Sequence, residues 1–288
     1  MEEYIYKYDP VPGLVSVIIP THNRANLITE TLNSFENQLY DNIELIIVDD
    51  HSTDNTKEIV EEISKRSRFE IYYIPSDGNG GCHARNIGLI NSRGEYIQFF
   101  DDDDLVNPDF FTKRVESLLK GYDFATCNFS YFKGDPTNIV GMKRIDNIPH
   151  TVDSHLKTGS LPTPCFLFKR TALKKIRFWN ESIKRLQDMA YYHRLFMYGL
   201  TGDWRNECLF NVRQHDKNIS QRVSFEGMIY AYSMIENEWK GKKDYWQVAK
   251  VCTIAMLSIL YHNKTRCLTK EWIYSVFYVL NKVLLIIF

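Results

Sequence analysis

The sequence predicts an α/β protein whose largely parallel sheet is flanked by helices on both faces. Short apolar runs alternate with amphipathic segments along the first half of the 288-residue chain. This alternation favours parallel strands joined by right-handed crossovers. The apolar run at 96–100 is followed at once by four acidic residues, here called the aspartate row: Asp101, Asp102, Asp103 and Asp104. Open α/β sheets bind ligands at the carboxyl ends of their strands, so the aspartate row marks the expected site.

The expected strands are short and rich in β-branched or aromatic residues. The first, at 15–19, reads Val-Ser-Val-Ile-Ile, and the second, at 43–48, reads Ile-Glu-Leu-Ile-Ile-Val. Near-continuous apolar runs of this length, bounded by polar residues, are typical of strands buried in a parallel sheet. Further strands are expected at 69–74, 96–100, 124–132 and 165–169.

Helices are expected between these strands. The first is indicated by apolar positions that recur at helical spacing from Leu27 to Phe35. The second follows Ser52, Thr53 and Asp54, which suit an N-terminal cap. Further helices are expected at 84–91, 110–119, 171–176 and 189–198, whereas 133–159 shows no sustained period and is predicted to be an irregular excursion.

Composition narrows the functional classes. With 44% hydrophobic and 14% aromatic residues, the chain has ample material for a packed core. Its net charge of -1 gives no electrostatic drive toward nucleic acid, which we do not expect as a partner. The six cysteines are scattered without a CxxC pair, as in reduced thiols of a cytoplasmic protein. The first twelve residues do not resemble a secretory signal.

The aspartate row admits two explanations. Four adjacent carboxylates repel one another unless a cation compensates them, and Mg²⁺ or Mn²⁺ prefers oxygen ligands. The alternative is a solvated loop whose aspartates cap the helix that begins near Pro108. The other strand ends favour the metal site, because parallel strands deliver segments 20–24, 49–50, 76–81 and 101–104 to one edge.

That edge suits a nucleotide. Asp49 and Asp50 offer acceptors for ribose or base, and Arg85, just beyond a glycine-rich loop, can reach phosphate. The diphosphate would lie over a metal held by the aspartate row, which screens the charge on a departing phosphate.

Four segments resemble, in order, the signature of glycosyltransferase family 2, whose members are inverting enzymes with the GT-A fold. They are 16–24 (SVIIPTHNR), 46–54 (IIVDDHSTD), 84–88 (ARNIG) and 94–104 (GEYIQFFDDDD). The resemblance covers about residues 14–220. The family that it points to includes bacterial enzymes that assemble surface polysaccharides. It implies a nucleotide-sugar donor, usually a UDP-sugar, and a hexosyl- or N-acetylhexosaminyltransferase activity toward a glycan or lipid-linked oligosaccharide acceptor.

The resemblance also assigns roles to residues. The nucleotide pocket would be lined by Pro20, Thr21, Asn23 and Arg24, with Asp50 on the base and Arg85 assisting. The family's Asp-x-Asp motif is ambiguous in register here. We take Asp101 and Asp103 as the motif, with Asp103 the main metal ligand and Asp102 the next candidate. Helix capping by Asn23 and a surface ion pair of Arg85 remain alternative explanations.

The second half is expected to build the acceptor side. An acidic residue at a helix start serves the family as general base, and Asp188 matches it, preceded by Gln187 where relatives often have Glu. Glu181 is the reserve candidate. As an alternative, Asp188 could only cap its helix. The segment at 212–220 resembles one in which a histidine approaches the metal, which assigns His215 as a ligand unless its role is structural.

The predicted organisation has four parts. Residues 1–13 form an N-terminal extension, 14–132 the nucleotide-sugar-binding half, 133–222 the acceptor-binding half and 223–288 a C-terminal helical region. The last part mixes basic, aromatic and aliphatic residues and falls short of the ~20 apolar residues of a membrane span. It suits helices at the cytoplasmic face of an anionic membrane, or helices that pack on the protein or form a homo-oligomer.

The sequence therefore predicts a metal-dependent inverting glycosyltransferase that uses Mn²⁺ or Mg²⁺. Two alternatives remain. One is a nucleotidyltransferase that makes a sugar nucleotide, although residues 20–24 lack the glycine-rich, basic stretch of that class. The other is a non-catalytic nucleotide-sugar-binding or scaffold module.

Overall fold

The computed structural model describes residues 7–145, 161–184 and 186–215, together with isolated positions between 233 and 253. The chain divides into two compact units. The first consists of Met1–Asn147, Leu161–Glu181 and Tyr198–His215, and the second of Ile148–Ser160, Ser182–Met197 and Asp216–Phe288. The expected helical region at 223–288 lies almost entirely outside the described residues. Within the described ranges, no helix combines the length and apolar composition that crossing a bilayer requires.

The first unit is built on one sheet. The strand order is β3-β2-β1-β4-β8-β6-β9-β5, and β7 pairs with β6. The strands are β1 (Val11–Thr21), β2 (Ile43–Asp49), β3 (Glu70–Pro75), β4 (Gly94–Phe99), β5 (Leu105–Val106), β6 (Phe124–Phe132), β7 (Ile139–Lys143), β8 (Leu167–Lys169) and β9 (Gly202–Arg213).

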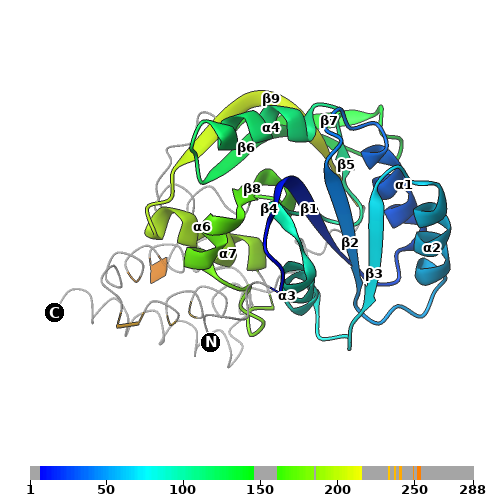
Figure 1. The fold of residues 1–288 in the computed structure, drawn as a ribbon, viewed down its shortest axis with the longest axis horizontal. Helices are drawn as coiled ribbons and strands as arrows, with labels where there is room; N and C mark the ends of the chain where they lie inside the picture. The colour runs from blue at the N-terminus through cyan, green and yellow to red at the C-terminus, as the bar shows by residue number, and fades with distance from the viewer. Residues whose placement is uncertain are drawn as a thin grey trace, which may run out of the picture. The chain divides into compact units, whose positions relative to one another are not determined.

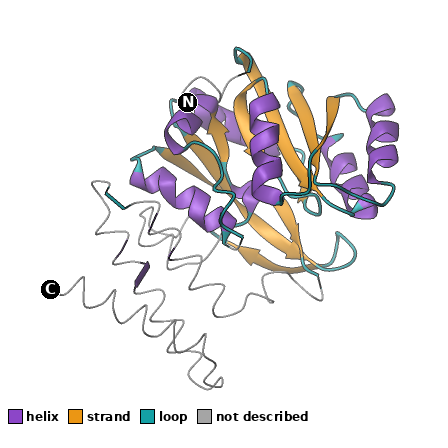
Figure 2. Cartoon of the chain, turned by 90° about the horizontal axis from the view of Figure 1, so that it is seen from below, coloured by secondary structure: helices purple, strands orange, loops and turns teal. Residues whose placement is uncertain are grey.

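Helices connect these strands and cover the sheet. They are α1 (Ala25–Phe35), α2 (Thr56–Arg66), α3 (Gly81–Asn91), α4 (Phe110–Leu119), the short 3-10 helix η2 (Thr163–Cys165) and α6 (Arg170–Ile176); α7 (Gln187–Met197) belongs to the second unit. Figure 1 shows α1 and α2 on one side of strands β1 to β3 and α3 on the other. Figure 2 shows the same strands between their helices from below.

The predicted parallel sheet is confirmed for β3, β2, β1 and β4, which run parallel to one another. Their ends are level, because Thr21 pairs with Asp49 and Asp49 pairs with Pro75. The rest of the sheet is mixed: β9 is parallel to β6, whereas β8, β7 and β5 pair antiparallel with their neighbours. The level ends of the parallel strands create the edge at which the expected site should form.

Three strands were not predicted from the sequence. β7 lies within the segment 133–159 that was expected to be irregular, so that expectation is wrong for Ile139–Lys143. It is a hairpin strand with Ile139, Val140 and Met142 about half exposed, and it lacks a buried face to give it a period of two. β5 has two residues, and β9 has mixed polarity, so neither shows a continuous apolar run.

The core lies between the parallel strands and their helices. The central residues of β1 and β2, including Val17, Ile18 and Ile47, are fully buried. α3 packs very closely on β1, because a Cβ on Gly88 would lie 2.3 Å from Cγ2 of Ile18. This close approach fixes α3, which carries Arg85, against the strand that leads into the expected nucleotide pocket.

Candidate active site

The carboxyl ends of the parallel strands meet, as predicted. The Asp50 amide donates to the Thr21 carbonyl at 2.8 Å, and the Ser76 amide donates to the Asp49 carbonyl at 2.8 Å. The Phe100 amide donates to the Ile18 carbonyl at 2.9 Å, which brings the start of the aspartate row to the end of β1. The loops after β1, β2, β3 and β4 therefore share one edge of the sheet.

Members of the aspartate row differ in exposure. Asp102 and Asp104 are 5% and 2% exposed, whereas the side chains of Asp101 and Asp103 are 29% and 14% exposed. Asp102 accepts hydrogen bonds from Thr21 Oγ1 at 2.7 Å and from Arg24 at 2.8 Å. Two of the four carboxylates are thus held inward, and the pair taken as the Asp-x-Asp motif is the more accessible one.

Arg24 joins two members of the row. Its Nη1 lies 2.8 Å from Asp102 Oδ1 and 2.8 Å from Asp103 Oδ2. Burial of the guanidinium opposes its charge, but Asp102 and Asp103 together raise the pKa of Arg24. Arg24 therefore acts as an internal cation for the carboxylates in the structure.

Burial and nearby charges shift the pKa values of Asp102, Asp103 and Asp104 in different directions. Burial raises the pKa of Asp102 and, together with the charges of Asp103 and Asp101, raises that of Asp104 well above its ordinary value. Burial also opposes ionisation of Asp103, but the hydrogen bond with His215 and the charge of Arg24 outweigh it and lower the pKa of Asp103. Asp103 is therefore the member of this trio best kept as an anion, the form that binds a cation.

His215 reaches Asp103 from the end of β9. Its Nε2 lies 2.8 Å from Asp103 Oδ2, and its ring is 35% exposed. A carboxylate oxygen suits Mn²⁺, and an imidazole nitrogen can complete the coordination of a transition-metal ion. Among the described residues, no group of three or more His, Cys, Asp or Glu side chains converges as a complete metal cluster. Asp103 and His215 could thus hold a metal only as part of a larger coordination shell.

Asp50 organises the loop that follows β3. Its carboxylate accepts hydrogen bonds from the Gly80 amide at 2.9 Å and from Ser76 Oγ at 3.0 Å, and so orders the glycine-rich loop after β3. Its backbone carbonyl lies 2.6 Å from Nδ1 of His22. Pro20, at the end of β1, pairs with Val48 of β2. The structure thus places Pro20 and Asp50 at the same edge.

Asn23 has a role that the sequence did not indicate. It adopts φ 53°, and its Oδ1 accepts hydrogen bonds from the Thr53 amide at 2.7 Å and the Asp54 amide at 3.3 Å. Helix α1 begins after Arg24, and the side chain of Asn23 does not cap it. Asn23 instead ties the loop after β1 to the loop after β2, and Asp54 reinforces this link by accepting from the Ala25 amide.

Arg85 joins the same edge from α3. Its Nη2 donates to Asp101 Oδ1 at 2.8 Å, and its guanidinium lies over the Trp179 ring at 4.8 Å from the centroid. The side chain is only 9% exposed, so the alternative of a solvated surface pair does not describe it. Arg85 thus contacts the first member of the aspartate row, and Arg24 contacts the two middle members.

Asp188 belongs to the second unit. It lies in the first turn of α7, after Gln187, and is partly exposed. The side-chain amide of Gln187 donates to the Ile183 carbonyl at 3.1 Å. The reserve candidate Glu181 ends a segment of the first unit, where it accepts a hydrogen bond from Asn86 at 2.8 Å and lies 3.0 Å from Nδ1 of His83. Glu181 is therefore engaged in holding the chain.

Two solved structures share the fold. The crystal structure of S. aureus TarS 1-349 in complex with UDP-GlcNAc aligns with a TM-score of 0.72 at 20% identity, over 94% of this chain and 81% of that one. The mannosyltransferase PcManGT from Pyrobaculum calidifontis, in complex with GDP-Man and Mn2+, aligns with a TM-score of 0.61 at 17% identity, over 98% and 84% of the two chains. These similarities confirm the predicted GT-A fold.

Sequence comparison identifies the family. The model of glycosyl transferase family 2 matches residues 16–177, more than half of the chain. TuaG of Bacillus subtilis (strain 168), whose name describes a teichuronic acid biosynthesis glycosyltransferase, is 30% identical over 241 residues, which cover 82% of this chain and 86% of TuaG. These matches give no support to the two alternatives, a nucleotidyltransferase and a non-catalytic module. The chain belongs to glycosyltransferase family 2 and is a glycosyltransferase.

Proposed function

We propose that the protein transfers a sugar from a UDP-sugar to a hydroxyl group of a glycan or lipid-linked oligosaccharide, with inversion at the anomeric carbon. One observation carries the proposal: Asp50, Arg24 and the Asp103–His215 pair lie on one edge of the sheet. That arrangement can accommodate a base, a diphosphate and a cation together. The complex of TarS with UDP-GlcNAc supports the choice of UDP.

Divalent-metal dependence is part of this proposal. Asp103 and His215 already converge, and the pKa of Asp103 is lowered. The carboxylate fits Mn²⁺ or Mg²⁺, and the imidazole would add a nitrogen ligand to a transition-metal ion such as Mn²⁺. The donor diphosphate and water would supply the remaining ligands. When bound, the ion would neutralise charge on the departing diphosphate. Arg24, released from Asp103, would turn toward the same phosphates.

The chemistry requires one base. The acceptor oxygen forms a bond to the anomeric carbon while the bond from that carbon to the diphosphate oxygen breaks. The acceptor proton passes to a carboxylate, a role that we assign to Asp188 at the start of α7. Arg85 holds Asp101 in place. Asp50 orders the loop against which the nucleobase of the donor would lie.

The acceptor class is proposed from chemistry and kinship. TuaG is named for teichuronic acid biosynthesis, which supports a glycan or lipid-linked acceptor here. The reaction would then take place at the cytoplasmic face of the membrane, with residues 223–288 as the candidate for peripheral contact.

A donor panel tests the proposal. UDP-, GDP- and dTDP-sugars are incubated with the protein and Mn²⁺, and release of nucleoside diphosphate is measured with and without acceptor glycans. We expect turnover with a UDP-sugar and loss of turnover on chelation. Asp188→Asn should retain donor binding and lose transfer by a factor on the order of 10²–10⁴. Binding of UDP-sugars without turnover of any donor would contradict the assignment.

A further inference from the structure

Asn86 of helix α3 hydrogen-bonds the segment 179–181, which lies far from the helix in sequence. The side-chain amide of Asn86 pairs with the backbone of Trp179 in both directions: Nδ2 donates to the Trp179 carbonyl at 2.9 Å, and the Trp179 amide donates to Oδ1 at 2.8 Å. Nδ2 also donates to Glu181 Oε1 at 2.8 Å. Asn86 is 7% exposed, so these bonds form in a largely dry environment where their loss is costly.

Neighbouring residues of α3 also contact the segment 179–181. His83 Nδ1 lies 3.0 Å from Glu181 Oε2, and the Arg85 guanidinium lies over the Trp179 ring. Trp179 is 2% exposed and packs edge-on against Phe99, the last residue of β4, with ring centroids 5.2 Å apart. The segment 179–181 is therefore held by α3 on one side and by the strand leading into the aspartate row on the other.

Arg85 connects this segment to the donor side. The same guanidinium that stacks on Trp179 donates to Asp101 at 2.8 Å. Two consecutive residues of one helix, Arg85 and Asn86, thus contact the aspartate row and the segment 179–181. A shift of Asp101 would be transmitted to Trp179 through one planar, largely buried side chain.

The position of this segment in the chain gives it a consequence for the reaction. Glu181 is the last residue of its stretch of the first unit, and Ser182 begins the second. Asp188 follows Glu181 by seven positions in the sequence. The contacts of Asn86 therefore fix the point from which the chain leaves the nucleotide-binding unit on its way to α7.

We propose that Asn86 is a positioning residue for transfer, which acts by fixing Trp179 and Glu181 so that the segment carrying Asp188 starts from one defined place. The inference rests on the proposed function, because it gives Asp188 the role of base. Placement errors of about 1 Å can cost on the order of 10² in rate without changing substrate affinity. A residue that served the fold alone would change stability and leave the rate of the folded enzyme unaltered.

Substitution of Asn86 by Asp tests the proposal with little change in volume. Asn86→Asp removes the donor to the Trp179 carbonyl and places a carboxylate against that of Glu181. We expect kcat to fall about 100-fold while KM for the donor stays within about threefold of the wild type. Glu181→Gln in the same protein restores a donor between the two side chains, and we expect it to recover at least about tenfold of the lost kcat.

Asn91→Asp is the matched control. Asn91 lies at the end of the same helix, and its Nδ2 donates to the Ile87 carbonyl at 2.8 Å, a bond within the helix itself. We expect its kcat to stay within about twofold of the wild type. A wild-type kcat for Asn86→Asp, or a fall in melting temperature with kcat retained in the folded fraction, overturns the proposal.

Limited proteolysis provides a readout that needs no activity. Trypsin cleaves after Lys184, three residues beyond Glu181 in the sequence. We expect cleavage of native Asn86→Asp at this bond to be about tenfold faster than in the wild type and to return toward the wild-type rate with Glu181→Gln. Unchanged cleavage in all variants contradicts the inference. If the wild type turns over no donor, the proposed function fails, and the proteolysis comparison still shows whether Asn86 fixes the segment 179–181.

Discussion

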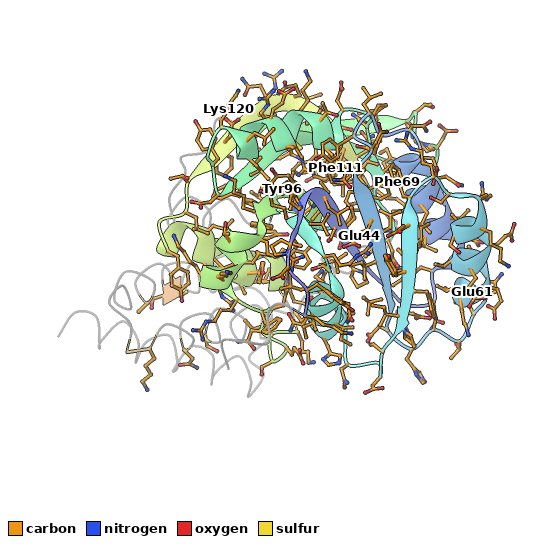
Figure 3. The ribbon with its side chains drawn as sticks, in the orientation of Figure 1. Glu44, Glu61, Phe69, Tyr96, Phe111 and Lys120 are labelled. Atoms are coloured by element: carbon orange, nitrogen blue, oxygen red, sulfur yellow. The ribbon has the colours of Figure 1, made fainter. Side chains whose placement is uncertain are left out.

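Two clusters of carboxylates and arginines lie at opposite ends of the same parallel strands. They differ in how far their carboxylates are buried and hydrogen-bonded within the protein. The carboxyl-end cluster consists of the aspartate row with Arg24, Arg85 and His215. The amino-end cluster consists of Ser16, Glu44, Glu70, Tyr72 and Arg93. Glu44 of β2, labelled in Figure 3, has a side chain that is 1% exposed. It accepts from Ser16 Oγ at 2.5 Å, from the Arg93 amide at 2.7 Å and from Arg93 Nε at 2.8 Å.

This difference indicates that the amino-end cluster stabilises the fold and that the carboxyl-end cluster is the candidate binding site. Glu44 has its hydrogen bonds supplied by neighbouring strands and loops, so it stabilises the fold in a fixed arrangement. At the other end, Asp101 and Asp103 are partly exposed and each meets a cationic or imidazole side chain. A metal ion can take the place of such a partner beside the carboxylate, and the released arginine can then bind a phosphate. A carboxylate cluster becomes a candidate site when its partners are accessible and replaceable.

Exchange of Asp103 for Asn should give the largest effect and the sharpest contrast. We expect Asp103→Asn to lower metal-dependent turnover of the donor by a factor on the order of 10³, because it removes the anionic ligand beside His215. Its melting temperature should fall only modestly, because the weakened contacts with Arg24 and His215 are partly offset by lower repulsion within the row. Measurement of diphosphate release over a Mn²⁺ titration decides the point, and full activity would remove Asp103 from the site.

Glu44→Gln should show the opposite pattern. It leaves Arg93 without its buried carboxylate, and we expect the free energy of unfolding to fall by about 1–3 kcal/mol. Turnover per folded molecule should match the wild type. Chemical denaturation followed by tryptophan fluorescence measures the loss. A stability equal to the wild type would mean that the amino-end cluster does not support the sheet.

Gly88→Ala tests the packing that holds α3 between these two ends. The added methyl would lie 2.3 Å from Cγ2 of Ile18, so α3 must shift away from β1. We expect a loss of about 1–3 kcal/mol in the free energy of unfolding. Because α3 carries Arg85, the donor KM should rise as well. Gly121→Ala, where the Cβ would meet no atom within 4 Å but φ is +106°, separates backbone strain from this clash.

The smallest expected effect is a pH dependence at the amino-end cluster. Burial and the hydrogen bond to Glu70 raise the pKa of Tyr72 to about 12, above its unfolded value of about 10. A raised pKa contributes stability that is complete below the unfolded pKa and is lost as pH rises through the folded one. The melting temperature should therefore fall less between pH 10 and about 12 in Tyr72→Phe than in the wild type. Identical slopes would contradict the role of the Glu70 bond.

The meeting of the aspartate row with the loops after β1 and β2 could be predicted from the sequence, because the parallel topology alone brings these strand ends together. Once β1, β2 and β4 are parallel, Thr21, Asp49 and the aspartate row must share an edge. The individual bonds could not be predicted in this way. That Arg24 joins Asp102 to Asp103, and that Asn23 ties two loops instead of capping α1, depends on side-chain directions in irregular loops.

Other features left weaker signals. Glu44 stands alone in an apolar strand, and a charge in such a place indicates a buried partner, but the identity of Arg93 does not follow from it. β9 has mixed polarity and was missed, although it carries the chain to His215. Asn86 was visible within the segment 84–88, yet its contact with Trp179 spans 93 positions and depends on how the chain returns to α3.

Calorimetry of UDP binding tests the central claim that the carboxyl-end cluster is a metal-dependent donor site. The wild-type protein is titrated with UDP in Mn²⁺ and again in chelator. We expect binding at least about tenfold tighter with Mn²⁺, because Asp103 and His215 would share the ion with the diphosphate. Equal affinity in the two conditions would contradict the account.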